Sequence, residues 1–226
     1  YYNNRKKAVS TKNAGKAFVF SSKSNRTRLN DLGETIKRQT IEVYTNKNDL
    51  RLPKAINSSG KTVTRQNIPA GSLIIPLDQP LNTLIKNILS FDIRLDTKSM
   101  EKERKKLLKD KGSTLYDVTA WSLSHAYGTD SYYTEAMPKI SMDVFQPILN
   151  EGKLIGKNPK YGWAIKSDDD QFYHLVGRLL ENKVKAWCAK EGFNIEGEFF
   201  PRGSIVIRNN SNKSMKVGLL KKLAAK

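Results

Sequence analysis

Short apolar runs and amphipathic stretches alternate in the first part of the chain, in the order strand, helix, strand. Residues 17–20, Ala-Phe-Val-Phe, form a continuous apolar run that predicts a buried strand. Apolar residues at helical spacing follow at Leu29, Leu32 and Ile36. Residues 41–44 and 71–77 predict two further strands, and residues 81–89 predict a second helix.

The same order returns near the C-terminal end. Residues 162–165 and 184–188 predict strands on either side of a helix. The apolar face of that helix consists of Phe172, Leu175, Val176 and Leu179. Residues 200–207, Phe-Pro-Arg-Gly-Ser-Ile-Val-Ile, repeat the pattern of residues 68–75, Ile-Pro-Ala-Gly-Ser-Leu-Ile-Ile. The chain therefore contains an internal duplication.

We place repeat one at 17–90 and repeat two at 161–226, within one α/β domain from 17 to 226. A strand–helix–strand unit cannot bury both of its faces alone. We therefore expect the strands to join one mostly parallel sheet, with right-handed crossovers and helices on both faces. Gly33 and Gly177 stand at a similar point of the two helices, where the missing side chain lets a neighbouring strand approach closely.

Three segments lie between the repeats. Residues 96–112 are a highly charged insert, which we expect to be an exposed helix or a mobile excursion. Residues 116–128 predict a central helix that begins after the N-cap Asp117 and ends at Gly128. Residues 131–160 contain three prolines and two glycines, which predict an irregular connection.

The central helix has two interpretations. Its apolar residues spread around the whole circumference, which favours a core helix packed on several sides. The alternative is a pocket lined by Trp121, His125 and Tyr127. We place such a pocket beside Asp117, Trp121 and His125, where a helix N-terminus meets aromatic surface, and Arg202 adds a positive charge from repeat two.

The charge of the chain is strongly positive and unevenly distributed. Forty Lys and Arg residues against 22 Asp and Glu give a net charge of +18. Residues 1–115 hold 24 basic against 10 acidic residues, and residues 211–226 hold 5 against none. Residues 1–16 predict a basic flexible arm. Such a field favours anionic partners, and a solubilising lysine-rich surface is the other interpretation. No membrane span or signal peptide is evident in the sequence.

The remaining motifs favour structural over catalytic interpretations. Residues 55–62 fit a permissive phosphate-binding loop, but the extended sequence on both sides favours a turn at Asn-Ser-Ser-Gly. His125 and His174 lack the neighbouring ligands of a metal site. Cys188 is either a nucleophile paired with His174 or a buried, inert thiol. Residues 168–170, three aspartates, either bind a cation or stabilise a helix start. We predict no catalytic residue, cofactor or metal in this chain.

Three motifs carry a resemblance to a known family. They are residues 69–80, Pro-Ala-Gly-Ser-Leu-Ile-Ile-Pro-Leu-Asp-Gln-Pro, residues 116–123, Tyr-Asp-Val-Thr-Ala-Trp-Ser-Leu, and residues 200–204, Phe-Pro-Arg-Gly-Ser. With them, residues 15–210 resemble the region that follows the peptidase in large bacterial zinc carboxypeptidases of the carboxypeptidase A type. The resemblance implies a periplasmic or extracellular protein, and a fold related to glutamine-amidotransferase-like or flavodoxin-like domains without the nucleophile. The zinc ligands of the family, a His-x-x-Glu pair and a distant histidine, and its catalytic glutamate match no position here.

Two hypotheses of function follow. The resemblance implies a non-catalytic accessory segment of a larger, exported zinc metallocarboxypeptidase-like protein, which supports the peptidase domain or shapes substrate access. Its partners are then the peptidase domain of the same polypeptide and a peptide or protein substrate, and the parent protein holds the zinc ion. The alternative is a stand-alone basic protein that binds nucleic acid or another polyanion, because the positive charge favours such partners.

Overall fold

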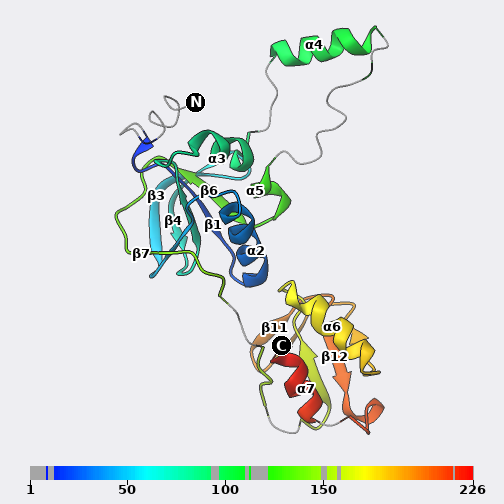
Figure 1. Ribbon diagram of the computed structural model, residues 1–226. Coiled ribbons are helices and arrows are strands. Elements are labelled where there is room, and N and C mark those ends of the chain that lie inside the picture. Colours follow the sequence, from blue (N-terminus) through cyan, green and yellow to red (C-terminus); the bar gives the residue numbers. More distant parts are fainter. Residues whose placement is uncertain are drawn as a thin grey trace. The chain divides into compact units, whose positions relative to one another are not determined.

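In the computed structural model, the chain divides into two compact units (Figure 1). The first unit comprises Tyr1–Ser22 and Asp31–Gln146, and the second comprises Lys23–Asn30 and Pro147–Lys226. The residues that the structure describes are 9, 13–92, 97–109, 112, 122–148, 152–156, 159–215 and 217–225. Among them, no helix is long and apolar enough to cross a membrane.

The first unit is built around a seven-stranded sheet with the strand order β4-β3-β6-β1-β5-β2-β7. Its elements are β1 (Ala17–Ser21), α2 (Arg26–Lys37), β2 (Tyr44–Asn46), β3 (Leu50–Asn57), β4 (Thr62–Ile68), β5 (Leu73–Pro76), α3 (Asn82–Leu89), α4 (Thr97–Leu107), α5 (Leu123–Ala126), β6 (Asp130–Thr134) and β7 (Met142–Val144). The start of α2, up to Asn30, is counted with the second unit. Strand β1 lies in the middle of the sheet and is buried along its whole length, which agrees with its continuous apolar sequence.

The second unit contains a three-stranded sheet with the order β8-β12-β9 and a short β10–β11 hairpin. Its elements are β8 (Gly162–Ile165), α6 (Gln171–Glu181), β9 (Trp187–Cys188), β10 (Phe193–Ile195), β11 (Glu198–Phe200), β12 (Ile205–Arg208), the 3₁₀ helix η2 (Asn209–Ser211) and α7 (Val217–Ala224). Like the β3–β4 hairpin of the first unit, the β10–β11 hairpin stands between the second strand of its repeat and the strand that follows Pro-x-Gly-Ser.

The strands of the two repeats pair in the same register. In the first unit β5 lies between β1 and β2, and in the second β12 lies between β8 and β9. Phe18 pairs with Ile75 as Trp163 pairs with Ile207. The neighbouring pair, Tyr44 with Ile74, corresponds to Trp187 with Val206. The register therefore defines which residues of the two units are equivalent.

The prediction of a mostly parallel sheet is wrong. All strand pairs in the described parts of the chain are antiparallel. Strands β1 and β2 do run in the same direction, because both are antiparallel to β5. The hairpin that precedes β5 brings this strand back between them, however, so the strands joined by helix α2 are not neighbours. A doubly wound sheet of the flavodoxin-like or glutamine-amidotransferase-like kind is excluded for the same reason.

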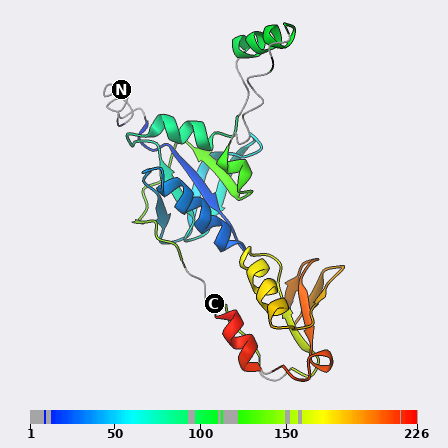
Figure 2. The same cartoon turned by 45° about the vertical axis from the view of Figure 1, so that its right-hand side comes forward.

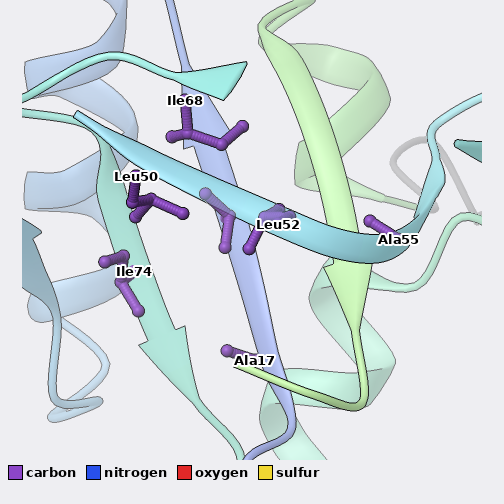
Figure 3. Packing of buried hydrophobic residues seen from close by; sticks show 7 residues of the cluster. Ala17, Leu50, Leu52, Ala55, Ile68 and Ile74 are labelled. Atoms are coloured by element: carbon purple, nitrogen blue, oxygen red, sulfur yellow. The ribbon is translucent and has the colours of Figure 1, made fainter. Parts of the chain in front are cut away.

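We expected helices on both faces of the sheet, but in the first unit a hairpin covers one face of the central strands. Successive residues of a strand point to opposite faces, so Ala17 and Val19 lie on one face of β1. The β3–β4 hairpin, rather than a helix, covers that face, and Leu50 and Leu52 of β3 lie above β1 and β5 (Figure 3). The buried cluster consists of Ala17, Val19, Leu50, Leu52, Ala55, Ile68 and Ile74.

Helices cover only one face of the sheet in the second unit. Helices α6 and α7 lie on the same side of the strands (Figure 2). The buried cluster beneath them consists of Trp163, Leu179, Val184, Ile205, Ile207, Leu220 and Leu223. The strands of the β10–β11 hairpin have three residues each, whereas β3 has eight and β4 has seven. The second unit therefore lacks a hairpin as long as the one that covers the first.

The segments between the repeats agree only in part with the expectations. The charged insert contains α4, and Gly128 has the positive φ expected of a helix end. Of the central helix predicted at 116–128, the described residues show only the short α5, and its predicted cap Asp117 lies outside them. Residues 131–160 are not irregular throughout, because most of β6 and all of β7 lie there and join the sheet.

Candidate functional site

Among the residues that the structure describes, no helix covers the second face of the β8-β12-β9 sheet. Trp163, Ile205 and Ile207 point toward α6 and α7, so the residues that alternate with them point to the other side. There Val206 pairs with Ala164 on one side and with Trp187 on the other. The next pair on that face is Arg208 and Gly162. These five residues line a cavity of about 360 Å³, and we call this surface the open face.

The open face corresponds to a buried face of the first unit. The register makes Ala164, Val206 and Trp187 equivalent to Val19, Ile74 and Tyr44. In the first unit the equivalent residues lie in or against the cluster that the β3–β4 hairpin completes. The cavity of the second unit lies on the equivalent face, and Phe193 and Ile195 of the short β10–β11 hairpin contribute to its lining.

The positively charged side chain of Arg208 lies in the open face and contacts two aromatic rings. The guanidinium carbon of Arg208 is 4.8 Å from the ring centre of Trp187 and 5.9 Å from that of Tyr161. Both distances allow attraction between the cation and the ring. The Nε of Arg208 is buried and has no hydrogen-bond partner among the residues described. Leaving this N–H unpaired costs about 1–3 kcal/mol.

The surroundings of Arg208 are apolar and partly exposed. Tyr161 is 64% exposed and Ile195 is 42% exposed, and both line the cavity. Contiguous exposed apolar side chains mark binding surfaces. A ligand that combines apolar groups with one negative charge fits this surface best.

The site residues predicted from the sequence lie elsewhere. Asp117 and Trp121 fall outside the described residues. His125 is exposed on α5 in the first unit, with its Nε2 3.2 Å from the carbonyl oxygen of Phe91. Arg202 is exposed in the turn before β12 in the second unit. Neither His125 nor Arg202 lines the open face or the cavity of the first unit described below.

Sequence reasoning missed Tyr161, Trp187 and Arg208. One signal was available in the spacing of the repeats. Tyr44 and Pro69 are 25 positions apart, whereas the equivalent Trp187 and Pro201 are 14 apart, so the hairpin of repeat two had to be shorter. A second signal was the arginine that stands at 208 where repeat one has a proline.

Of the remaining motifs, residues 55–62 form the predicted turn. Asn57 Oδ1 accepts hydrogen bonds from the backbone N–H groups of Ser59 and Lys61, and Gly60 has a positive φ. Cys188 is exposed, which excludes the buried thiol.

The aspartates before α6 make contacts within the second unit. Asp169 accepts a hydrogen bond from the backbone N–H of Gln171 at the start of α6, as expected for a residue that stabilises a helix start. Asp170 accepts two hydrogen bonds from the guanidinium of Arg28, at 2.8 and 2.7 Å. This guanidinium lowers the pKa of the Asp170 carboxyl below its usual range.

A second cavity, of about 650 Å³, lies in the first unit. Phe18, Tyr133, Phe91 and the turn at 58–60 contribute to its lining. Burial, followed by the nearby carboxylate of Glu135, raises the pKa of Tyr133 to about 12. The hydroxyl donates a hydrogen bond to Glu135 Oε1 at 3.2 Å. Tyr133 is therefore neutral at every ordinary pH, and its hydroxyl acts here as a hydrogen-bond donor.

The raised pKa of Tyr133 predicts a loss of stability at high pH. An unfolded tyrosine ionises near pH 10, so the unfolded state releases a proton that the folded state holds until about pH 12. The free energy of unfolding should fall between these values, and it should fall less steeply in Tyr133→Phe. In a pH titration, the difference in phenolate absorbance between the unmodified protein and Tyr133→Phe should have its midpoint near pH 12. A midpoint near 10 would contradict the burial of this hydroxyl.

Among the described residues, no three His, Cys, Asp or Glu side chains come together in a group that could hold a metal ion. Comparisons of the chain with protein-family models, with curated proteins and with solved structures found no match.

Proposed function

We propose that this chain is a non-catalytic accessory segment of a larger, exported zinc metallocarboxypeptidase-like protein. The three motifs at 69–80, 116–123 and 200–204 support this part of the proposal by their resemblance to the region after the peptidase. The zinc ion then belongs to the peptidase domain of the parent protein, in the periplasm or outside the cell. The second part of the proposal is that the open face binds another polypeptide segment, supplied by the peptidase domain or by its substrate.

Polypeptide binding is supported by a difference between the two units: a long hairpin covers the sheet face in the first unit, and only a short hairpin stands in the equivalent position of the second. In the first unit, an apolar hairpin lies over β1, β5 and β2, and it buries the residues equivalent to Ala164 and Val206. Burial of such surface contributes roughly 25 cal/mol for each Å² of apolar area removed from water. Because polypeptide strands already cover this face in one copy, a polypeptide segment is the ligand that its shape supports in the other.

The parent protein can be tested by isolating the natural protein with an antibody raised against this chain. We expect an intact mass well above the 25.6 kDa of this chain, with about one zinc ion for each polypeptide. Protein recovered with a non-immune antibody provides the control for carried-over metal. A metal-free natural protein of 25.6 kDa would overturn the accessory role.

A further inference from the structure

We infer that the polypeptide segment bound by the open face carries an aspartate or glutamate side chain, which pairs with the guanidinium of Arg208. This inference rests on the proposed function and specifies the chemistry of the partner. It concerns an interior residue of an extended segment, whose neighbours on the same face of the strand are apolar.

Arg208 lies against aromatic rings, and its hydrogen bonding is incomplete. Its guanidinium contacts the rings of Trp187 and Tyr161, and its Nε has no acceptor in the described part of the second unit. A guanidinium presents its N–H groups as a planar fork, which matches the two oxygens of a carboxylate. The two rings restrict the orientation of this fork before a ligand binds, which lowers the entropic cost of pairing.

Arg208 has no charged counterpart in the first unit. The residue equivalent to Arg208 in the first unit is Pro76, which carries no charge. The cover of the first unit is accordingly apolar where it meets the sheet, through Leu50 and Leu52 of β3. A cover that suits the second unit needs the same apolar side chains at alternating positions, together with one negative charge beside Arg208.

The cover of the first unit also indicates where in the bound segment the carboxylate lies. The segment that covers the first unit is an interior strand, and its residues continue into β4 without a chain end. An equivalent cover of the second unit passes over the face in the same way. The carboxylate is therefore a side chain rather than the C-terminus of the bound polypeptide.

Three pentapeptides test this inference on the full chain by NMR titration, with the Trp187 indole and the Val206 amide as reporters. The probe Ac-Leu-Ser-Glu-Ser-Leu-NH2 places a carboxylate between two leucines on one face of a strand, in either chain direction. Its neutral counterpart has glutamine in the middle, and the third peptide has this glutamine with a free C-terminal carboxylate. We expect the glutamate peptide to bind about tenfold more tightly than the neutral one, as a charge-assisted hydrogen bond implies.

Variants of the chain separate this inference from the proposed function. Arg208→Gln should abolish the preference for glutamate, whereas Lys190→Gln, the same charge change on an exposed residue outside the cavity, should keep it. Ala164→Phe fills the open face and should weaken all three peptides. Equal affinity for the glutamate and glutamine peptides, with loss in Ala164→Phe, would overturn the carboxylate and leave polypeptide binding intact. Preference for the free C-terminus would overturn the side-chain assignment. If no peptide binds, or if Ala164→Phe leaves the binding unchanged, both the carboxylate inference and polypeptide binding by the open face are overturned.

Discussion

Leu52→Ala is expected to lower the free energy of unfolding of the first unit by about 2–5 kcal/mol. Leu52 is 0% exposed and belongs to the cluster with which the β3–β4 hairpin covers β1 and β5. Truncation removes buried methyl groups and leaves a cavity that the two packed layers fill only in part. Urea denaturation monitored by hydrogen exchange of the β1 and β5 amides would measure this loss for the first unit separately.

The matched control for Leu52 is an apolar residue of the shorter hairpin. Ile195 stands on β10, lines the open face and is 42% exposed. Ile195→Ala should change the free energy of unfolding of the second unit by no more than about 0.5 kcal/mol, as is usual for surface positions. Similar losses in the two variants would show that the second hairpin packs on its sheet as the first does. The open face would then not exist in solution.

The sequence located most elements of the two repeats, because each is marked by short-range signals. Apolar spacing at Leu29, Leu32 and Ile36 identified α2, and all three side chains are buried. The two Pro-x-Gly-Ser motifs identified β5 and β12, and the glycines Gly71 and Gly203 both have positive φ in the turns before these strands. Signals of this kind depend on a few neighbouring residues and are therefore readable from the chain alone.

The order of the strands in the sheet could not be predicted from such short-range signals. The position of β5 between β1 and β2 depends on how far the preceding hairpin carries the chain, and no local pattern records that distance. Strands β6 and β7 were missed because Pro138 and Pro147 dominated the interpretation of 131–160, although the strands end before each proline. The open face arises from the shortness of the β10–β11 hairpin, so its residues carry no motif of their own, and Arg208 becomes notable only beside its equivalent Pro76.

Gly33→Ala is expected to destabilise the first unit, although alanine favours a helix more than glycine does. A methyl group at position 33 of α2 would lie 2.6 Å from Cζ and 2.7 Å from Cε1 of Phe145. The ring of Phe145 is buried, and its backbone N–H is fixed by a hydrogen bond to the carbonyl of Val43 at 2.9 Å, so it has little room to withdraw. Overpacking of this kind costs about 1–3 kcal/mol, against which the gain in helix propensity is about 1 kcal/mol.

Gly177→Ala should have the opposite effect, because none of the residues that the structure describes lies within 4 Å of the methyl group that it adds to α6. The predicted close approach of a strand is found at neither glycine, because the neighbour of Gly33 is the ring of Phe145, which follows β7, and no described residue lies as near to Gly177. The gain should be about 0.5–1 kcal/mol, since alanine restricts the unfolded chain and suits the helix. Thermal unfolding of the two variants beside the unmodified protein would show whether each substitution lowers or raises the stability. Destabilisation by Gly177→Ala would mean that a further segment packs against α6, and that the second unit is covered on its helical side as well.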